Sequence, residues 1–564
     1  MTEVGLIGDG TALEAVRAAL ADTPADATAV DAAAVGRTDL AVCVGTVEAE
    51  NEDAASAARA AGTPIVVVEL GGVGGRAVAG VDATVSGHAP GTACFECLRQ
   101  RVAAVGEETA DVTVDATTAR FAGAVAGREA AVLVAGGESP ILGGVIEVPH
   151  ARRRLLAVPG CACAAGRDRS LVLEDAGRPL EEALSAAEAA FDARLGPITA
   201  VGEVESFPVP YYMATVASVP FADVDPPDHA AGVAADWDPA FMKALGEALE
   251  RYSAAVYRTS ALETTPAEPV DPARFVHPGD PVEAAAVEAW HPGERLDTGD
   301  PVDLPAEVVV FPPPERRIRP ASTTGLGLGN GGVDAILSGL YEVIERDAAM
   351  LAWYSTYEPV GLAVDDDGFG TLAARARSED LAVTALSLTQ DVDVPVTAAC
   401  VHRDGEWPRF AAGMAASLDP TAAARNALEE ALQNWIELRR MGPDRAADES
   451  GAIGRYAEFP TAAREFVDPS TTVPAATVGP DSVPEGRAAL SAVVDRLVAA
   501  DLEAYGARLT PRDVEGLGFE AVRAVVPSAQ PLFTDDAYFG ERARTVPATF
   551  GYEPRLDRDH HPFP

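Results

Sequence analysis

Lysine is almost absent from this chain of 564 residues, and basic side chains are scarce overall. Lys243 is the single lysine, and 43 basic residues stand against 87 acidic ones, which leaves a formal net charge of −44 at pH 7. A surface of that charge repels the phosphates of nucleic acids and the headgroups of anionic lipids. We therefore expect no nucleic-acid partner and no membrane partner.

Long apolar runs are also lacking. The sequence has no stretch of about eighteen apolar residues, the length that a membrane-spanning helix needs. Its first ten residues lack the basic start and apolar core of a signal peptide. These absences predict a soluble cytoplasmic protein. A disordered acidic chain is excluded because 48% of the residues are hydrophobic, and the length predicts two or more domains.

Cysteine is too rare for a disulfide scaffold, with six residues in the whole chain. Four of the six form two close pairs, Cys94 with Cys97 and Cys161 with Cys163. Four thiolates are the complete ligand set of a closed structural zinc site, so we predict zinc here rather than buried free thiols. Cys43 and Cys400 stand alone in apolar segments and are predicted to pack in the core.

Residues 1–165 are predicted to form the first domain. Short strands at 4–8, 40–44 and 64–69 alternate with a helix at 13–20, which is typical of a parallel α/β sheet. The turn Gly8-Asp-Gly10 suggests a dinucleotide site, but the third glycine of that fingerprint is missing. We therefore predict a Rossmann-like scaffold that binds zinc and holds no nucleotide.

Residues 166–197 are predicted to be a linker with an amphipathic helix at 180–195. Residues 198–564 are then predicted to form a second α/β domain, which begins with strands at 198–207 and 211–217 because these are rich in β-branched and aromatic residues. The whole chain is thus expected to be α/β.

The second domain contains a helix-forming stretch at residues 338–347. Residues three and four apart are neighbours on a helix, so Ser338, Glu342, Glu345 and Arg346 share one face. A glycine-rich segment at 325–332 precedes it, and glycine lets backbone N–H groups approach a ligand closely. The combination suits a metal-bound polyphosphate.

Two other segments carry similar patterns. Glu247, Glu250 and Arg251 repeat the Glu-x-x-Glu-Arg spacing, and Glu430, Gln433 and Glu437 fall on one helical face. Each segment alone is more simply interpreted as a solvated amphipathic helix. Three together favour a Mg²⁺ site, because Mg²⁺ in nucleotide sites bridges a few carboxylates to phosphates.

These motifs, with the ending His561-Pro-Phe-Pro564, resemble the YcaO family of ATP-dependent enzymes that modify peptide backbones, in particular its azole-forming, SagD-like members. The resemblance covers about the last two-thirds of the chain. It implies that Mg²⁺ is held by Glu247, Glu250, Glu342 and Glu345. It also implies that ATP is bound by these glutamates and by Arg251, Asn330, Asp334, Ser338, Arg346, Glu430 and Gln433.

The flanks of the cysteines resemble the reduced ubiquitin-activating-enzyme-like half of azole-forming cyclodehydratases, which binds and presents the precursor peptide.

At the other end of the sequence, the resemblance implies that the tail at residues 559–564 reaches the ATP pocket. Prolines restrict the tail to an extended form, which lowers the entropy cost of placing it in a cleft. We expect His561 or the carboxylate of Pro564 to accept the proton of the attacking side chain.

The sequence departs from the family pattern at one point. Relatives carry Gly-Lys-Gly eleven residues before the first glutamate helix motif, where this chain has Gly232-Val233-Ala234, and Lys243 falls at a serine position. A phosphate-facing lysine is therefore missing. Either another cation replaces it, for which Arg316, Arg317 and Arg319 are candidates, or ATP binding is altered.

The reaction implied by the resemblance is ATP-dependent cyclodehydration of Cys, Ser or Thr in a ribosomally made peptide to azolines, as in bacteriocin biosynthesis. The side chain attacks the preceding amide carbonyl, ATP phosphorylates the resulting oxygen, and phosphate leaves. Two alternatives remain open: thioamide formation and a non-catalytic peptide-binding scaffold. A homodimer, and a separate dehydrogenase or sulfur-delivery protein, are possible partners, and the acidic composition is similar to that of halophilic archaea.

Overall fold

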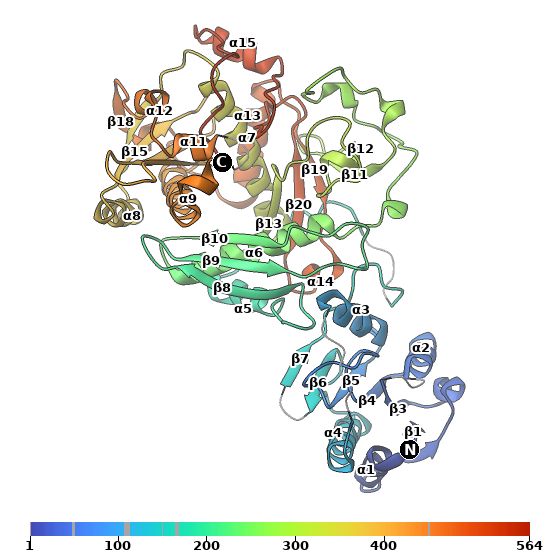
Figure 1. The fold of residues 1–564 in the computed structure, drawn as a ribbon. Coiled ribbons are helices and arrows are strands. Elements are labelled where there is room, and N and C mark those ends of the chain that lie inside the picture. Colours follow the sequence, from blue (N-terminus) through green and yellow to red (C-terminus); the bar gives the residue numbers. More distant parts are fainter. Residues whose placement is uncertain (1, 48–50, 107–112, 149–150, 164–167, 449–451) are drawn as a thin grey trace.

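A computed structural model of the chain describes residues 2–47, 51–106, 113–148, 151–163, 168–448 and 452–564. The chain forms a smaller N-terminal unit and a larger body. The three-stranded sheet of the body lies on the side that faces the N-terminal unit (Figure 1). The predicted boundary at residues 165 and 166 lies outside the described residues.

The N-terminal unit is built on a seven-stranded sheet in the order β2-β1-β3-β4-β5-β6-β7. The strands are β1 Glu3–Ile7, β2 Asp26–Ala29, β3 Leu40–Thr46, β4 Ile65–Leu70, β5 Ala83–His88, β6 Gly144–Val148 and β7 Ala151–Arg154. The helices are α1 Gly10–Leu20, α2 Asn51–Ala61, α3 Phe95–Val105 and α4 Ala116–Val134. The first four strands are parallel, as the sequence predicted, whereas β5, β6 and β7 pair antiparallel.

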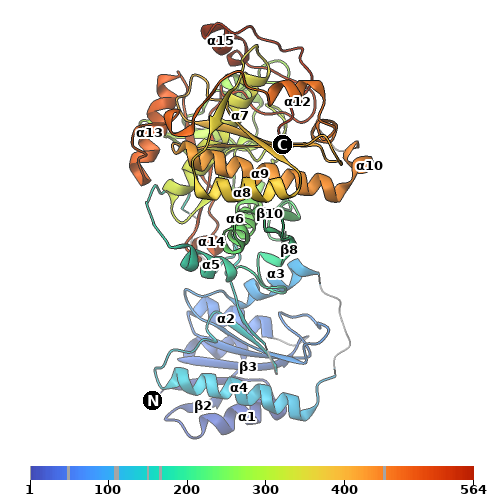
Figure 2. The ribbon, with the colours of Figure 1, turned by 90° about the vertical axis from the view of Figure 1, so that its left-hand side faces the viewer.

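Helices cover both faces of this sheet (Figure 2). Val42 and Val66 face α1 and α4, while their neighbours Ala41 and Ile65 pack on the opposite face with α2. Because both faces are buried, the central strands are continuously apolar, as is typical of parallel sheets. This continuous pattern is why the strands at 40–46 and 65–70 were predictable.

The linker helix is shorter than predicted. Helix α5 spans Leu180–Glu188 and does not continue to residue 195. A turn replaces its last part because the carboxylate of Asp192 accepts hydrogen bonds from the backbone N–H groups of Arg194 (2.8 Å) and Leu195 (2.9 Å). Short side chains that bond nearby backbone N–H groups favour turns over helix interiors.

The larger body contains three sheets, in the orders β10-β9-β8, β12-β11-β19-β20-β13 and β17-β16-β15-β14-β18. The first contains β8 Ile198–Glu205, β9 Tyr211–Val216 and β10 His229–Val233. The second contains β11 Trp290–Arg295, β12 Pro301–Pro305, β13 Leu326–Gly329, β19 Tyr505–Arg508 and β20 Glu520–Val525. The third contains β14 Val360–Ala363, β15 Ala382–Ser387, β16 Val396–His402, β17 Phe410–Ala416 and β18 Thr472–Pro474.

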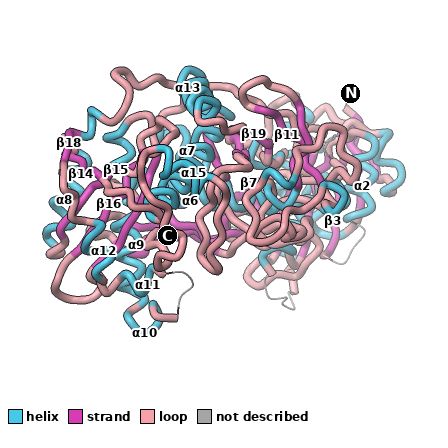
Figure 3. The backbone as a smooth tube through the Cα atoms, turned by 90° about the horizontal axis from the view of Figure 1, so that it is seen from above, coloured by secondary structure: helices cyan, strands magenta, loops and turns pink. Residues whose placement is uncertain are grey.

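Three long helices lie where these sheets meet: α6 Trp237–Ala255, α7 Gly332–Trp353 and α9 Pro420–Met441. Seen from above, α7 lies between the two five-stranded sheets (Figure 3). The remaining helices are α8 Asp367–Ser378, α10 Pro443–Ala446, α11 Ile453–Tyr456, α12 Thr461–Phe466, α13 Gly486–Ala499, α14 Arg512–Glu515 and α15 Arg542–Thr549. Short 3₁₀ turns occur at Ala32–Arg37, Thr259–Ala261, Pro272–Arg274, Ala284–Ala286, Ala306–Val308 and Ala475–Thr477.

Half of the glycine-rich segment before α7, residues 326–329, forms strand β13. Strand β13 pairs antiparallel with β20, and α7 packs directly on it. A Cβ atom at Gly327 would lie 2.1 Å from the carbonyl oxygen of Ala335, well inside contact distance. The glycines therefore serve first to bring helix and strand together.

The hydrophobic cores of the two parts are continuous. One cluster of buried side chains runs from Val67 and Leu98 in the N-terminal unit to Leu245, Leu249 and Tyr252 on α6. The two units are therefore packed against each other through a shared apolar core. No helix within the described residues combines the length and the hydropathy that crossing a bilayer requires.

Candidate nucleotide and metal site

Carboxylates from α6, α7 and α9 gather where the three helices meet. On each helix the glutamates are three or four residues apart, so they share one face. This face is separate from the apolar stripe of the same helix. The apolar stripes bind the helices to different sheets: α6 to β10, α7 to β13 and β20, and α9 to β16 and β17. The sheets thereby turn the three polar faces toward one another.

A cavity of about 500 Å³ opens between α6 and the start of α7. Five residues predicted from the sequence line it: Glu247, Glu250, Asn330, Asp334 and Ser338. The other lining residues are Ala231, Met242, Lys243, Gly246, Leu328, Gly329 and Phe519. Its volume is within the range of small-ligand sites.

The two glutamates of α6 are in different environments. Glu247 accepts from Arg251 Nη2 (2.8 Å) with one oxygen and from the backbone N–H of Ala231 (2.9 Å) with the other. Glu250 lies 3.6 Å from Arg251 Nε, and burial raises its pKa to about 8, with the charges of Glu342 and Glu247 acting in the same direction. Glu250 therefore binds a proton more readily than an ordinary glutamate and is favoured as a carboxylate only beside a cation.

Helix α7 provides a second arrangement of the same kind. One oxygen of Glu342 accepts from Arg346 Nη2 (2.9 Å), and the other accepts from the backbone N–H of Gly325 (2.9 Å). Arg346 also donates to Thr324 Oγ1 (2.8 Å). The Glu-x-x-x-Arg pairs on α6 and α7 thus have the same geometry, and each anchors its glutamate to a strand or turn.

Two further carboxylates lie deeper. Burial raises the pKa of Glu345 well above its usual value, and the charge of Glu430 adds to this effect. Burial likewise raises the pKa of Glu430 to about 7, although a hydrogen bond from the backbone N–H of Met414 opposes the shift. Gln433 instead donates to Glu437 (3.0 Å), at the edge of this group.

The beginning of α7 is shared between the cavity and a preceding segment. Val333 N–H donates to the carbonyl of Glu174 (3.2 Å), and a side chain at Gly332 would collide with the carbonyl of Val172. Part of the helix N-terminus predicted to bind phosphate is therefore covered by residues 172–174. The Oδ1 atom of Asn330 is buried and has no hydrogen-bond partner among the described residues. A buried acceptor without a partner is costly, which favours a ligand at this point.

At Gly232-Val233-Ala234, where the family pattern has Gly-Lys-Gly, the middle residue is apolar and lies in the core. Val233 is 3% exposed and packs with Tyr211, so no lysine is present at this point. Lys243 lines the cavity instead, and its Nζ lies 2.6 Å from Glu429 Oε2. The sequence interpretation missed this cation because it stands at a position where relatives have serine.

The three arginines considered as substitutes are not in this cavity. Arg316 is exposed, and Arg317 pairs at the surface with Glu288 and Glu315. Arg319 lies over the ring of Phe275, 5.7 Å from its centre. Arg523 was not predicted; burial and the charge of Arg319 lower its pKa to about 9, while the charges of Glu342 and Glu250 oppose this shift.

A second cavity, also of about 500 Å³, adjoins the first across Glu247 and Ala231. Tyr211 donates from its hydroxyl to Glu437 (2.9 Å) within it, and Met213, Met441 and Val204 provide apolar walls. Glu437 was noted in the helix pattern, but its partner on β9 is 226 residues away and gave no local signal.

The C-terminal tail is embedded in the larger body, and the terminus lies beside its helices in two views (Figures 1 and 2). Phe563 is 3% exposed and packs edge-on against Trp353 and Phe466. His561 is 1% exposed, its Nε2 lies 2.7 Å from the carbonyl of Phe533, and burial lowers its pKa to about 3. The charge of Arg346 contributes to this lowering. Neither His561 nor Pro564 is among the residues that line the two cavities at Glu247.

Four cysteines form a separate cluster in the N-terminal unit. The Sγ atoms of Cys94, Cys97, Cys161 and Cys163 lie within 4.8 Å of one another. Neighbouring pairs are 3.5–3.8 Å apart, and a tetrahedral ion with bonds of about 2.3 Å separates its sulfurs by about 3.8 Å. The geometry fits a four-coordinate metal. In the described residues no glutamate group is as tightly assembled.

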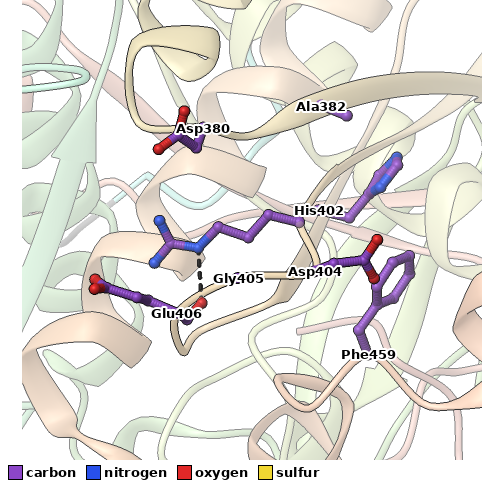
Figure 4. A pocket seen from close by; sticks show the side chains of 8 residues that line it. Asp380, Ala382, His402, Asp404, Gly405, Glu406 and Phe459 are labelled. Atoms are coloured by element: carbon purple, nitrogen blue, oxygen red, sulfur yellow. Dashed lines mark hydrogen bonds between the residues drawn. The ribbon is translucent and has the colours of Figure 1, made fainter.

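Another cavity, of about 550 Å³, lies at the end of the β16–β17 hairpin (Figure 4). Asp380, His402, Glu406 and Phe459 line it, and Arg403 Nε donates to the carbonyl of Glu406 (2.7 Å). It contains none of the residues predicted from the sequence. The carboxylate cluster, not this hollow, is therefore the candidate site.

Comparison with protein families agrees with this choice. The family described as YcaO cyclodehydratase, ATP- and Mg²⁺-binding, matches residues 231–530, a range that contains α6, α7 and α9. An uncharacterized protein of Methanothermobacter thermautotrophicus is 30% identical over 334 residues, which are 56% of this chain and 85% of that protein. An uncharacterized protein from the tfuA 3′ region of Rhizobium leguminosarum bv. trifolii is 29% identical over 128 residues, or 20% of this chain and 30% of that protein.

Two solved structures have a similar fold over the whole chain. A heterocyclase in complex with substrate and cofactor has a TM-score of 0.75 at 19% identity, and the likeness covers 100% of this chain and 85% of that one. The heterocyclase TruD has a TM-score of 0.67 at 18% identity and covers 100% and 84%. At these identities the likeness concerns the fold, and it includes the N-terminal unit.

Proposed function

Because the chain belongs to the YcaO family of ATP- and Mg²⁺-binding cyclodehydratases, we propose that it is an ATP-dependent enzyme that cyclodehydrates Cys, Ser or Thr residues of a peptide to azolines. The observation that carries the proposal is the group of partly buried glutamates on α6, α7 and α9 beside a cavity of about 500 Å³. Such carboxylates are costly to ionise unless a cation is present.

The residues fit Mg²⁺ and ATP. Glu247, Glu250, Glu342 and Glu345 would hold Mg²⁺, since carboxylate oxygens are its preferred ligands. Asn330, with its unpartnered buried Oδ1, and Ser338 would contact the nucleotide in the cavity. The other proposed nucleotide contacts are Arg251, Asp334, Arg346, Glu430 and Gln433. When bound, ATP supplies the phosphoryl group that converts an amide oxygen into a leaving group, and Mg²⁺ offsets the charge of the phosphates.

The arginines of the two helices hold the glutamates in place. Arg251 and Arg346 each bond a glutamate one turn earlier, which fixes the side-chain rotamers before any ligand arrives. The backbone N–H groups of Ala231 and Gly325 hold the second oxygens. Groups fixed in advance cost no reorganisation when charge develops in the reaction.

We infer that the peptide occupies the adjoining cavity, because it shares Glu247 with the nucleotide cavity. Its apolar walls and the Tyr211–Glu437 pair suit an extended segment with a small polar side chain. The proton of that side chain needs an acceptor. His561 is locked between Phe533 and Phe563 and is 1% exposed, whereas Pro564 is partly exposed. Of the two predicted acceptors, we therefore favour the carboxylate of Pro564.

The four cysteines are proposed to hold a structural zinc ion, with no role in bond making. N–H donors already point at two of the sulfurs: Val158 N to Cys97 (3.3 Å) and Arg512 Nη1 to Cys163 (3.5 Å). Such donors stabilise thiolates, which are the form that binds metal.

The N-terminal unit is proposed to bind and present the peptide.

The proposal is tested by incubating the purified protein with Mg²⁺, ATP and peptides encoded near its gene, and weighing the products. A loss of about 18 Da indicates cyclodehydration, and a gain of about 16 Da indicates thioamide formation with added sulfide. Peptide binding without a change of mass would support the scaffold alternative and contradict an enzyme. The same mixture with a candidate dehydrogenase or sulfur-delivery protein shows whether a partner is needed.

A further inference from the structure

A buried ion pair joins the N-terminal unit to the larger body. Arg101 on α3 pairs through Nη2 with Asp513 at the start of α14, and the two side chains are 1% and 0% exposed. Tyr252 on α6 completes the contact: its hydroxyl donates to Asp513 Oδ2 (2.5 Å) and accepts from Arg101 Nη1 (3.2 Å). The residues come from three segments far apart in the chain.

Each member of this triad adjoins a site already described. Tyr252 directly follows Arg251, whose guanidinium holds Glu247. Arg101 lies one turn after Cys97 on α3, and Asp513 follows Arg512, which donates to Cys163. The triad therefore connects the cysteine cluster with the helix that carries two of the candidate Mg²⁺ ligands.

A buried ion pair is not needed for stability. Replacing such a pair with apolar side chains of similar volume is often neutral or stabilising, because desolvation offsets the attraction. The surroundings here are apolar, since Arg101 also lies 5.4 Å from the ring centre of Phe221 and the core is continuous around Tyr252. Apolar contacts are non-directional, whereas hydrogen bonds have preferred angles. The hydrogen bonds to the Tyr252 hydroxyl give α6 a directional contact with the N-terminal unit, near the C-terminal end of the helix, whereas Glu247 and Lys243 bond it to β10 and α9.

We propose that Arg101 and Asp513 are positioning residues for the nucleotide site: by holding the hydroxyl of Tyr252 they set the orientation of α6 and so of Glu247 and Glu250. The N-terminal unit is then part of the nucleotide site, although it contributes no group that touches the nucleotide. This inference rests on the proposed function, because it takes the glutamates of α6 as ligands of Mg²⁺ and ATP.

The test uses the full chain with Mg²⁺ and the non-hydrolysable analogue AMPPNP, and compares nucleotide affinity with the melting temperature. Tyr252→Phe removes one oxygen and keeps the ring, so it tests the hydroxyl directly. Arg101→Met removes the guanidinium and leaves Asp513 unpaired, and the double variant Arg101→Met/Asp513→Asn removes that unpaired charge. We expect each variant to bind the analogue about fivefold or more weakly. The double variant should recover melting temperature relative to Arg101→Met but not affinity.

Arg153→Met is the matched control. Arg153 forms a comparable network in the N-terminal unit, with Glu147 (2.8 Å) and Asp192 (2.9 Å), but that network does not include α6. It should lower the melting temperature and leave affinity unchanged. Parent-like affinity in Tyr252→Phe overturns the inference, as does an equal loss of affinity in Arg153→Met. If Arg101→Met does not fold, the affinity of Tyr252→Phe for the analogue decides whether the inference holds. A parent protein that binds no Mg²⁺-AMPPNP overturns the proposed function itself, which is a different result.

Discussion

The Nζ atom of Lys243 lies 2.6 Å from Oε2 of Glu429, and Glu429 Oε1 accepts from the backbone N–H of Ala235 (3.0 Å). Lys243 thereby links α6 to α9 on the wall of the nucleotide cavity. The chain lacks the family's Gly-Lys-Gly lysine, so we expect the ammonium group of Lys243, together with Arg251 on the same helix, to meet an anionic ligand. It is half exposed, at 47% of its side chain, and has room to turn toward the cavity.

Lys243→Met tests that assignment. If the ammonium contacts phosphate, the substitution should weaken Mg²⁺-ATP binding about tenfold, the size of one charge-assisted hydrogen bond. Calorimetric titration with AMPPNP measures this. Glu429→Gln is the companion variant: it frees Lys243 while keeping its charge, and should leave affinity at or above the parent value. Equal affinity in Lys243→Met would show that the lysine serves only to hold Glu429.

The glutamates should act through Mg²⁺. Replacing Glu342 with Gln keeps the volume but removes the charge that a cation needs, so nucleotide affinity should fall about tenfold to a hundredfold while the fold persists. Glu247→Gln, Glu250→Gln and Glu345→Gln should behave alike. ATP hydrolysis at limiting Mg²⁺ is the measurement, and Glu358→Gln at an exposed position is the control. Parent-like hydrolysis by Glu342→Gln would refute the metal assignment.

Mg²⁺ binding should depend on pH because protons compete with the metal. The pKa of Glu250 is raised to about 8 and that of Glu430 to about 7, against a usual value of 4.5. Below pH 7 these groups hold protons, so Mg²⁺ affinity in the presence of AMPPNP should rise between pH 6 and about 8 and then level off. The stability of the metal-free protein should change with pH in the opposite direction. The folded state holds more protons than the unfolded state between pH 4.5 and about 8, so stability should fall as pH rises through that window.

Mg²⁺ titrations at pH 6, 7 and 8 measure the first effect, and denaturant unfolding of the metal-free protein measures the second. Glu250→Gln cannot titrate and should flatten both curves. An affinity that does not change over this range would mean that Glu250 and Glu430 are not coupled to the metal.

The cysteine cluster should contain one zinc ion per chain. Structural zinc contributes directly to the free energy of folding, so Cys97→Ser should unfold the N-terminal unit or lower its melting temperature strongly. Elemental analysis of protein purified without chelator measures the metal content. Cys400→Ala changes a lone buried cysteine and should keep the zinc. Protein that contains no zinc by this measurement would contradict the assignment.

The C-terminal tail should be required for peptide modification. Deleting residues 560–564 should abolish modification while nucleotide binding survives, because the candidate proton acceptor is lost but the glutamates remain. The deletion also removes buried Phe563, so a second variant is needed: a tag added after Pro564 keeps Phe563 and converts the carboxylate into an amide. Modification at the untagged rate by the tagged enzyme would show that the terminal carboxylate has no role.

The features that the sequence predicted are those with a local signal. The face of α7 that carries Glu342 and Arg346 follows from spacing alone, and the continuous apolar strands of the N-terminal unit follow from burial on both faces. The glycines at 325–332 were predictable as close approaches but not as part of a strand. Their partners, β20 and residues 172–174, are distant in the sequence.

Contacts between distant segments gave no signal in one sequence. Arg101 and Asp513 are 412 positions apart, and Lys243 and Glu429 are 186 apart. The sequence therefore gave no indication of which surfaces of the two units meet, and it placed Lys243 at a serine position of the family pattern without indicating its contact with α9. Such pairs become visible only when the helices and sheets are assembled.

The depth of Phe563 in the core also bears on how this segment moves. Its ring packs against Trp353, the last residue of α7, and against Phe466, and it is 3% exposed. Withdrawing the ring would leave an empty space at the end of α7, which costs free energy. Local opening of residues 559–564 is therefore expected to occur together with fraying of that end of α7, rather than as an independent motion of a loose segment.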